Sequence, residues 1–328
     1  MIALYVTSSE AVVGKTVVCA GVGKHLLRND KKIGFFKPII AKETEGADSD
    51  AVFMKHIFAL EEPVELICPV ISDESNLVSK IKEAYARVSS GKDVVIVEGR
   101  GELSIIEALD ARVVIVEGYS GELSKAKINS YKDFGEYLLG VVLNKVPRSQ
   151  VERMSGEMST QFGEAGINLL GVLPEDRALF TLTIGELAEH IQGEVLNSTE
   201  KSAELAENFM LGAMYVDPGP EYFGRKANKV VIVRGDRPDM QLAALETPTR
   251  CLVLSGNTSP IPDVLHRAED KKIPIILAKD DTTALVTSIE DALGKTRFHQ
   301  EKKLPKLAEI MEQHFDFQAV YKGLGLAK

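Results

Sequence analysis

The sequence predicts an α/β protein with a doubly wound, mostly parallel sheet, followed by a smaller α/β domain. Apolar strands alternate with helical stretches over residues 1 to about 175, and most of these strands are runs of Val, Ile and Leu without polar alternation. Such runs are typical of strands buried on both faces of a parallel sheet. The first strand also leads into Gly14-Lys15-Thr16, the end of a phosphate-binding loop. Ligands bind such sheets at the carboxyl ends of the strands, so the residues that follow each strand are informative.

Each element follows from this pattern. In the first half we expect strands at Ile2–Val6, Ile33–Pro38, Val94–Glu98, Val113–Glu117, Leu139–Asn144 and Leu169–Pro174. Helical patterns lie between them at 15–29, 48–59, 75–89, 121–137 and 148–165. In the second half we expect a helix at Ala203–Asn208, strands at Met210–Val216, Lys229–Arg234, Arg250–Ser255 and Ile273–Ala278, and helices at 238–246, 260–270 and 282–293. The predicted organisation is a first domain 1–180, a connector 181–200, a second domain 201–300 and a C-terminal helical tail 301–328.

The loop before the first helix has the chemistry of a phosphate site. Backbone N–H groups and the helix dipole favour an anion at a helix N-terminus. Gly14 lets the backbone approach the anion, Lys15 can reach the β- and γ-phosphates, and Thr16 can offer its hydroxyl to Mg²⁺. The first glycine of the usual motif is missing, and Ser8 or Ser9 stands in its place. An ordinary strand-to-helix turn is the alternative interpretation.

Polar side chains follow the other strands. Lys37 is placed to face the phosphates or an acidic substrate, and a solvated surface lysine is the alternative. Asp50 either caps the next helix or reaches Mg²⁺. Glu98 ends a core strand, which is where an acid that orients Mg²⁺ belongs. Asn144 can hydrogen-bond a base edge, and the turn at Pro174 can pass close to a ring.

The most distinctive stretch of the second half is Gly235-Asp236-Arg237-Pro238, a turn between a strand and a helix. Asp236 is expected to cap the helix that Pro238 opens. Arg237 suits an anion or a carboxylate, so Asp236 and Arg237 form a candidate second anion site. A structural turn with a surface ion pair is the alternative. The tail is expected to form an amphipathic helix at Leu304–Phe315, which His314-Phe315-Asp316-Phe317 docks on the core or on a partner subunit.

Composition bounds the function. The 328 residues include 39 basic and 48 acidic side chains, and the net charge of −9 argues against nucleic-acid binding through a basic surface. No apolar run reaches the roughly 18 residues of a membrane helix, and we expect no signal peptide. Cys19, Cys68 and Cys251 lie far apart and form no CxxC pair, as is typical of reduced thiols in a cytoplasmic protein. The histidines lack metal-ligand spacing, so we predict no zinc site.

These motifs resemble, in their order, those of dethiobiotin synthetases and of the related ATP-binding domain at the N-terminus of long phosphotransacetylases. The resemblance covers residues 1 to about 180 and rests on Ser8–Thr16, Phe36-Lys37-Pro38, Asp48-Ser49-Asp50-Ala51, Val97-Glu98-Gly99, Val142-Leu143-Asn144-Lys145 and Gly171–Pro174. It implies a P-loop NTPase fold with ATP and Mg²⁺ as cofactors, and Lys15 and Lys37 as catalytic cations on the phosphates. It implies that Mg²⁺ is held by Thr16, Asp50 and Glu98. The nucleotide contacts would come from Ser9, Glu10, Val13, Gly14, Lys15, Thr16, Val17, Asn144 and Pro174.

Departures from this pattern fall on the substrate side. The synthetase loop reads Gly-Thr-Asp-Thr-Glu-Val-Gly-Lys-Thr, and its substrate-side Thr and Glu are Ala11 and Val12 here. The Glu-Gly-Ala-Gly-Gly segment is Glu98-Gly99-Arg100-Gly101-Glu102, so a diaminopelargonate site is not expected. The segment around Gly235 resembles the DRTGG domain, although the final glycines of that signature are absent. A DRTGG domain implies regulation or oligomer contact.

Three functions fit these observations. The first is an ATP- and Mg²⁺-binding regulatory or interaction protein with at most slow ATP hydrolysis, which forms a homo-oligomer through the second domain and has a metabolic enzyme as a candidate partner. Bound ATP would order the segment 43–50. The second is an ATP-dependent ligase or synthetase, similar to dethiobiotin synthetase or cobyrinate amide synthase, that acts on a small carboxylic acid. The third is a binding module with a vestigial nucleotide site. We expect no nucleic-acid or membrane partner, and neither a phosphotransacetylase catalytic domain nor a glutaminase nucleophile elbow.

Overall fold

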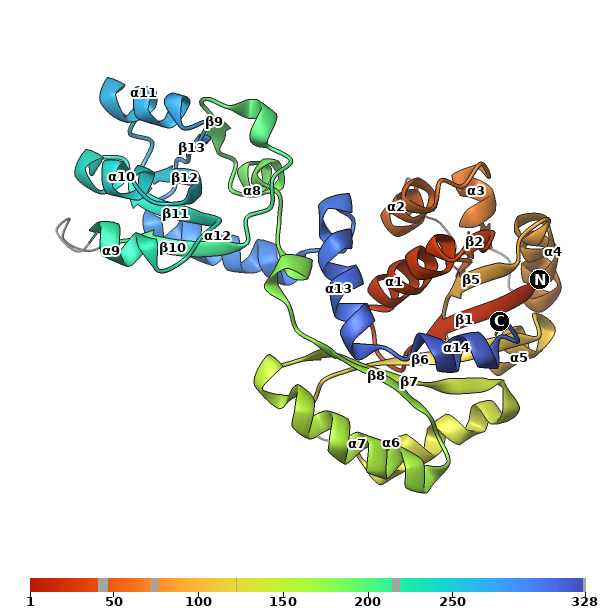
Figure 1. Ribbon diagram of the computed structural model, residues 1–328. Coiled ribbons are helices and arrows are strands. Elements are labelled where there is room, and N and C mark those ends of the chain that lie inside the picture. The colour runs from red at the N-terminus through yellow and green to blue at the C-terminus, as the bar shows by residue number, and fades with distance from the viewer. Residues whose placement is uncertain (41–46, 72–75, 122, 214–218, 327–328) are drawn as a thin grey trace. The chain divides into compact units, whose positions relative to one another are not determined.

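The computed structural model describes residues 1–40, 47–71, 76–121, 123–213 and 219–326. The chain divides into two compact units, of which the first contains residues 1–176 and 298–328 and the second contains residues 177–297 (Figure 1). The C-terminal tail therefore belongs to the first unit. The stretch 181–200, expected as a connector, lies within the second unit. Within the described ranges, no helix is long and apolar enough to cross a membrane.

The first unit is built on a parallel sheet, as the apolar strands predict. Its strand order is β2 (Ile33–Phe36), β5 (Val94–Glu98), β1 (Ile2–Thr7), β6 (Ala111–Gly118), β7 (Leu138–Val146) and β8 (Leu169–Pro174). The central strand β1 pairs with β5 on one side and β6 on the other, and both pairings are parallel. The predicted α/β class with a mostly parallel sheet is confirmed, and the carboxyl ends of β1, β5 and β6 meet at one edge.

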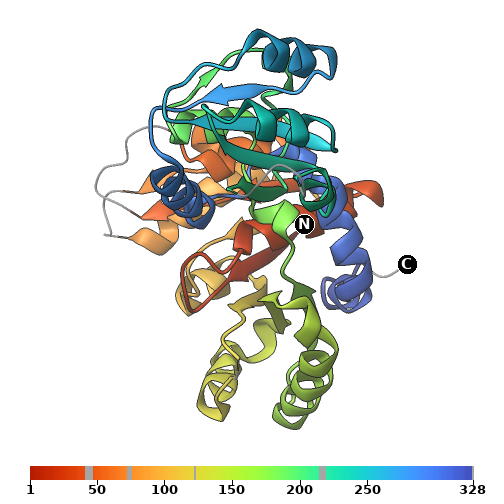
Figure 2. The ribbon, with the colours of Figure 1, turned by 90° about the vertical axis from the view of Figure 1, so that its left-hand side faces the viewer.

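Helices cover both faces of this sheet (Figures 1 and 2). One face carries α1 (Lys15–Arg28), α2 (Ser49–Phe58), α13 (Leu304–His314) and α14 (Phe317–Gly323). The other carries α4 (Leu77–Ser89), α5 (Leu103–Ala108), α6 (Lys125–Ser130) and α7 (Val151–Ala165), whose apolar side chains enclose a continuous core with the strands. Shorter elements complete the unit, namely α3 (Val64–Ile67), the paired strands β3 (Ile39–Ile40) and β4 (Val70–Ile71), and the 3₁₀ turns η1 (Tyr131–Tyr137), η2 (Arg148–Gln150) and η5 (Glu301–Lys303).

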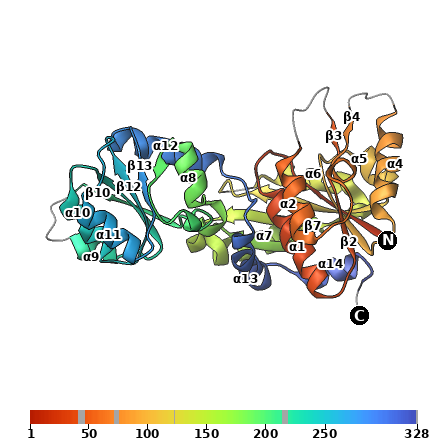
Figure 3. The ribbon, with the colours of Figure 1, turned by 90° about the horizontal axis from the view of Figure 1, so that it is seen from above.

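The C-terminal tail packs against α1, the helix that follows the phosphate loop. Met311 of α13 is buried, and a Cβ added to Gly21 of α1 would lie only 2.9 Å from the Met311 Cγ. The rings of His25 and Phe317 stack with their centroids 3.6 Å apart. Gly21 of α1 thus leaves room for the tail, and the N-terminal and C-terminal segments both belong to the first unit (Figure 3). The expected docking segment 314–317 contacts this unit's own core.

The second unit contains another mostly parallel sheet. Its order is β10 (Asn208–Gly212), β11 (Lys229–Arg234), β12 (Thr249–Ser255), β13 (Ile275–Leu277) and β9 (Glu194–Val195), and β9 alone among these runs antiparallel. Apolar residues pack on both faces of the sheet. The other elements are η3 (Arg177–Phe180), α8 (Ile184–His190), η4 (Thr199–Lys201), α9 (Gly219–Gly224), α10 (Pro238–Leu245), α11 (Pro262–Asp270) and α12 (Thr282–Lys295).

The helix expected at Ala203–Asn208 is wrong. A turn and a bend at 203–204 lead into a bridged stretch, in which the Ala206 N–H donates to the Leu182 carbonyl at 2.8 Å and Leu205 bridges to Thr183. Glu204 accepts a 2.8 Å hydrogen bond from Arg250. Helix propensity is a weak prior, and here the tertiary partners outweigh it. The expected strand Met210–Val216 is observed as β10, and residues 214–218 lie outside the described ranges.

The tail makes a testable contribution to the stability of the first unit. Replacing Met311 by Ala should lower the free energy of unfolding by about 2–4 kcal/mol, because a buried side chain leaves a cavity against α1. Gln313 is exposed on the same helix, so Gln313→Ala should change the free energy of unfolding by less than about 0.5 kcal/mol. Urea denaturation of both variants provides the measurement. Equal effects would show that the tail is not part of the folded core.

Candidate nucleotide-binding site

The loop between β1 and α1 depends on a glycine. Gly14, immediately before α1, has φ 96° and ψ 33°, which is the left-handed region that side chains rarely adopt. A Cβ at this position would lie 2.3 Å from the Asn144 Nδ2. Both the conformation and the close approach therefore require glycine here, and they aim the start of α1 at the space in front of the loop.

Side chains from β7 hold the loop in place. The Asn144 amide is buried and donates to the Val13 carbonyl at 2.9 Å, and the Lys145 ammonium donates to the Val12 carbonyl at 2.8 Å. Val13 itself is buried, and its side chain packs toward Gly118 at the end of β6. Asn144, expected at the adenine, thus braces the loop in this structure.

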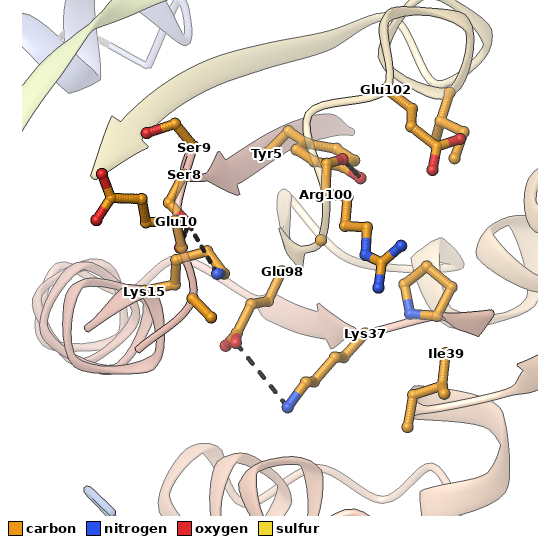
Figure 4. A pocket seen from close by; sticks show the side chains of 14 residues that line it. Tyr5, Ser8, Ser9, Glu10, Lys15, Lys37, Ile39, Glu98, Arg100 and Glu102 are labelled. Carbon is orange, nitrogen blue, oxygen red and sulfur yellow. Dashed lines mark hydrogen bonds and ion pairs between the residues drawn. The ribbon is translucent and has the colours of Figure 1, made fainter. Parts of the chain in front are cut away.

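Lys15 and Thr16 lie in the first turn of α1, and both side chains contact polar partners; Figure 4 shows Lys15. The Lys15 Nζ donates to the Ser8 Oγ at 2.9 Å, within the loop itself. The Thr16 hydroxyl donates to the Glu98 Oε1 at 3.1 Å. The structure therefore brings together the ends of β1 and β5 and the start of α1, as expected for a phosphate and Mg²⁺ site.

Lys37 follows β2 and is surrounded by acids. Its Nζ lies 2.6 Å from Asp50, 3.0 Å from Asp48 and 3.9 Å from the Glu98 Oε1. Asp48, not Asp50, caps α2 by accepting from the Ala51 N–H at 2.9 Å. Asp50 is therefore available to the ammonium, and the solvated-lysine alternative does not describe Lys37. Residues 41–46 of the polar stretch lie outside the described ranges.

Glu98 is a buried carboxyl group, and one of its two oxygens lacks a hydrogen-bond partner among the described residues. Burial raises the pKa of Glu98 to about 7, against the lowering effect of the nearby Lys37 ammonium. Among the described residues, its Oε2 is buried without a hydrogen-bond partner. A buried oxygen of this kind fits a cation or a water ligand, because leaving it unsatisfied costs free energy.

A second buried acid holds the other side of the loop, and the sequence analysis missed it. Glu117, at the end of β6, accepts from the Ser9 hydroxyl at 2.9 Å and pairs with the Lys127 Nζ at 2.8 Å. Lys127 also contacts Glu10 at 3.3 Å. Burial and the charge of Glu117 raise the pKa of the neighbouring Tyr131. The sequence does contain a signal for Glu117 as a site residue, because it is an acid at the end of an apolar strand, as Glu98 is.

A pocket of about 530 Å³ opens beside this loop (Figure 4). It is lined by loop residues, by the turn after β5 and by the segment after β2, with Ser8, Ser9, Glu10, Ala11, Lys15, Lys37, Glu98, Arg100 and Glu102 among them. Pro174, at the end of β8, is buried and pairs in register with Val146. Val17 is buried on α1. Contacts of Val17, Asn144 and Pro174 with a nucleotide remain predictions.

The candidate anion site of the second unit is internally paired. The Arg237 guanidinium donates to Asp239 at 2.9 and 2.7 Å, and Asp236 pairs with Arg234. The residue before α10 is Arg237, which makes no side-chain capping bond. The expectation that Asp236 caps this helix is therefore wrong, because its carboxylate is held by Arg234. Anion binding by Asp236 and Arg237 stays a prediction.

The fold and the glycine-dependent loop define a P-loop protein. The AAA domain family matches residues 3–181, and the DRTGG domain matches residues 186–292. Since the first match covers more than half of the sequence, the chain belongs to the AAA domain family and carries a DRTGG domain after it. The resemblance predicted from the motifs is confirmed.

Among the curated relatives, phosphate acetyltransferases match most of this chain, and a dethiobiotin synthetase matches about half of it. Phosphate acetyltransferase of Nitratidesulfovibrio vulgaris is 24% identical over 95% of this chain and 50% of its own length. The ATP-dependent dethiobiotin synthetase of Bacillus subtilis subsp. natto is 22% identical over 52% of this chain and 86% of that protein. The chain thus spans about half the length of the phosphate acetyltransferases that it matches. Among solved structures, the CBS and DRTGG domains of Clostridium perfringens pyrophosphatase share 13% identity over 45% of this chain and 70% of that one, with a TM-score of 0.31.

The Glu117 cluster yields a prediction about the loop. Lys127→Met should lower the free energy of unfolding by about 1–3 kcal/mol, because the Glu117 carboxylate is buried and loses its ion pair. Lys125 lies on the same helix and is exposed, so Lys125→Met serves as the matched control. Chemical denaturation measures both variants. If they behave alike, the ion pair does not hold the loop.

Proposed function

We propose that this chain is a cytoplasmic ATP- and Mg²⁺-binding protein with a regulatory or interaction role and at most slow ATP hydrolysis. The observation that carries the proposal is the left-handed Gly14 directly before α1, with Lys15 and Thr16 in the first helical turn. The unsatisfied N–H groups and the dipole of that helix favour phosphate. Membership of the AAA domain family supports a nucleotide as the ligand.

The proposed Mg²⁺ ligands are Thr16, Asp50 and Glu98. Hydroxyl and carboxylate oxygens suit this ion, and the partnerless Glu98 Oε2 supports a cation there. Within the described ranges, no group of three or more His, Cys, Asp or Glu side chains is arranged to hold a metal ion by itself. The remaining ligands would come from phosphate and water. The ion would neutralise phosphate charge, and Lys15 and Lys37 would share that role.

Slow turnover is proposed because the acceptor side of the loop is apolar. Phosphoryl transfer needs an aligned acceptor as well as a phosphate cradle. Ala11 lines the pocket without a polar group, and Val12 is exposed to solvent. An effect of bound ATP on the segment 43–50 stays a prediction, because residues 43–46 lie outside the described ranges.

A second function has one observation in its favour. The pocket beside Lys15 is large enough for a small acid, which supports an ATP-dependent ligase or synthetase as the alternative. Such an enzyme would phosphorylate a carboxylate or carbamate. Phosphate release measured alone and with a panel of small acids plus bicarbonate separates the two functions. Rapid release with one acid would favour the synthetase and overturn the regulatory proposal.

The nucleotide site is tested by Lys15. At a ligand concentration 100 times its dissociation constant, Mg-ATP should stabilise the wild-type fold by about 2.7 kcal/mol, and Lys15→Ala should lose most of this gain. Lys82 is exposed on α4, so the Lys82→Ala variant should still be stabilised by Mg-ATP as wild type is. Thermal melting with and without Mg-ATP is the measurement. The absence of a shift in wild type, or the same shift in Lys15→Ala, would exclude this site.

The pKa of Glu98 predicts a pH dependence for Mg²⁺. A carboxyl must lose its proton to ligate the ion, and this pKa is raised to about 7. The Mg²⁺-dependent part of the ATP affinity should therefore be fully present above this pH and fall as the pH drops through about 7, by up to tenfold per pH unit. Calorimetry with Mg²⁺ and with EDTA measures it. Glu98→Gln should flatten the profile, and an unchanged profile in that variant would contradict the assignment.

Self-association through the DRTGG domain is also proposed, with a metabolic enzyme as a further partner. Small regulatory modules commonly complete their surfaces in symmetric dimers. The second unit, which carries the DRTGG match, is compact and has its own core. Sedimentation of the full chain at micromolar concentration should show a dimer or a larger oligomer. A monomer under those conditions would contradict the proposal.

A further inference from the structure

Arg100 projects into the pocket from a turn that the protein holds rigidly (Figure 4). Its carbonyl accepts two hydrogen bonds, from the Tyr5 hydroxyl at 2.6 Å and from the Glu102 N–H at 2.8 Å. A Cβ added to Gly99 would lie 2.3 Å from the Tyr5 hydroxyl, so the phenol packs directly under this turn. Since these contacts hold the backbone of the turn, the Arg100 side chain extends into the pocket from a defined point of the chain.

Except for Glu102, the other charged side chains that line the pocket have partners among the described residues. Lys37 is held by Asp50, Asp48 and Glu98, and the Lys15 ammonium donates to Ser8. Glu10 contacts Lys127. Over the described residues, no carboxylate lies within ion-pair distance of the Arg100 guanidinium. As far as the described ranges go, Arg100 is therefore a cation that can recruit a ligand without first breaking an ion pair.

The remaining walls of the pocket near Arg100 are largely apolar. They come from the Tyr5 ring, Pro38, Ile39 and Ile105, with Glu102 as the remaining acid. A planar guanidinium fork matches a carboxylate through two parallel hydrogen bonds. Apolar walls next to such a fork suit a short hydrocarbon chain that carries the carboxylate.

We propose that this pocket binds a small carboxylate, held by Arg100 beside the nucleotide phosphates. The inference deepens the proposed function, because it names the chemical class of the second ligand at that site. In a regulatory protein this ligand is an effector, bound together with Mg-ATP. Glu102 distinguishes two kinds of ligand. An amine ligand would be attracted by the Glu102 carboxylate, whereas a carboxylate ligand would be repelled by it.

The test is calorimetry on the full chain saturated with Mg²⁺ and a non-hydrolysable ATP analogue. Acetate, butyrate, succinate and adipate are titrated in turn, with putrescine as the amine of matched length. At least one carboxylate should bind, and Arg100→Ala should weaken it about tenfold or more, as expected for a lost charge-assisted pair of hydrogen bonds. Glu102→Gln should leave it equal or tighter. Arg100→Lys keeps the charge without the fork and should retain part of the affinity.

The control is Arg112→Ala. Arg112 lies on β6 and donates to the Glu136 carbonyl, outside the pocket lining, so its replacement should not change carboxylate binding. The inference is overturned if no carboxylate binds, if Arg100→Ala binds as tightly as wild type, or if putrescine binds and depends on Glu102. It is also overturned if Arg100→Ala weakens the ATP analogue as much as the carboxylate, because Arg100 then holds a nucleotide phosphate.

The same titrations separate this inference from the function on which it rests. If the ATP analogue binds wild type and Lys15→Ala loses it, the nucleotide site stands whatever the carboxylates do. If the analogue fails to bind, the proposed function fails. Carboxylate binding without nucleotide would then be measured on the same samples, and its loss in Arg100→Ala would still support the anion pocket.

Discussion

The central contact of the phosphate loop is the one between the Asn144 amide and the loop backbone. The amide donates to the Val13 carbonyl and leaves no room for a Cβ on Gly14, while the Val13 side chain packs toward β6. The loop is therefore tied to the ends of two neighbouring strands as well as to its own. These contacts lie next to the left-handed Gly14 that precedes α1, in a loop that lacks the first glycine of the usual motif.

Strand order explains why two buried acids flank this loop. The strand β1 lies between β5 and β6. Glu98 near the end of β5 and Glu117 near the end of β6 therefore lie on either side of the residues that follow β1. Burying a carboxylate is costly unless it is paired and hydrogen-bonded. Glu98 meets the Thr16 hydroxyl and the Lys37 ammonium, and Glu117 meets Ser9 and Lys127. Because these buried carboxylates need partners, their hydrogen bonds and ion pairs connect the loop to the surrounding elements.

Family membership and the departures from it concern different parts of the site. The half of the chain that belongs to the AAA domain family retains Gly14, Lys15 and Thr16 on the nucleotide side. The turn after β5 instead presents Arg100 where the synthetase pattern has alanine. Tyr5 contacts the backbone of that turn, so Arg100 extends from a turn that the core supports.

The sequence alone determined the parallel sheet, the loop and the polar residues at the strand ends, because buried apolar runs and a glycine before a helix are local patterns. It placed Val94–Glu98 and Leu169–Pro174 at their observed bounds. Only the tertiary structure decided which side chains meet. Local pattern suggested a helix at Ala203–Asn208, where a turn and a bend lead into a stretch with backbone partners from 182–184. The partners of Lys37 and Glu117, the bracing role of Asn144 and the packing of the tail on α1 involve residues distant in the chain, and their geometry depends on strand order and burial.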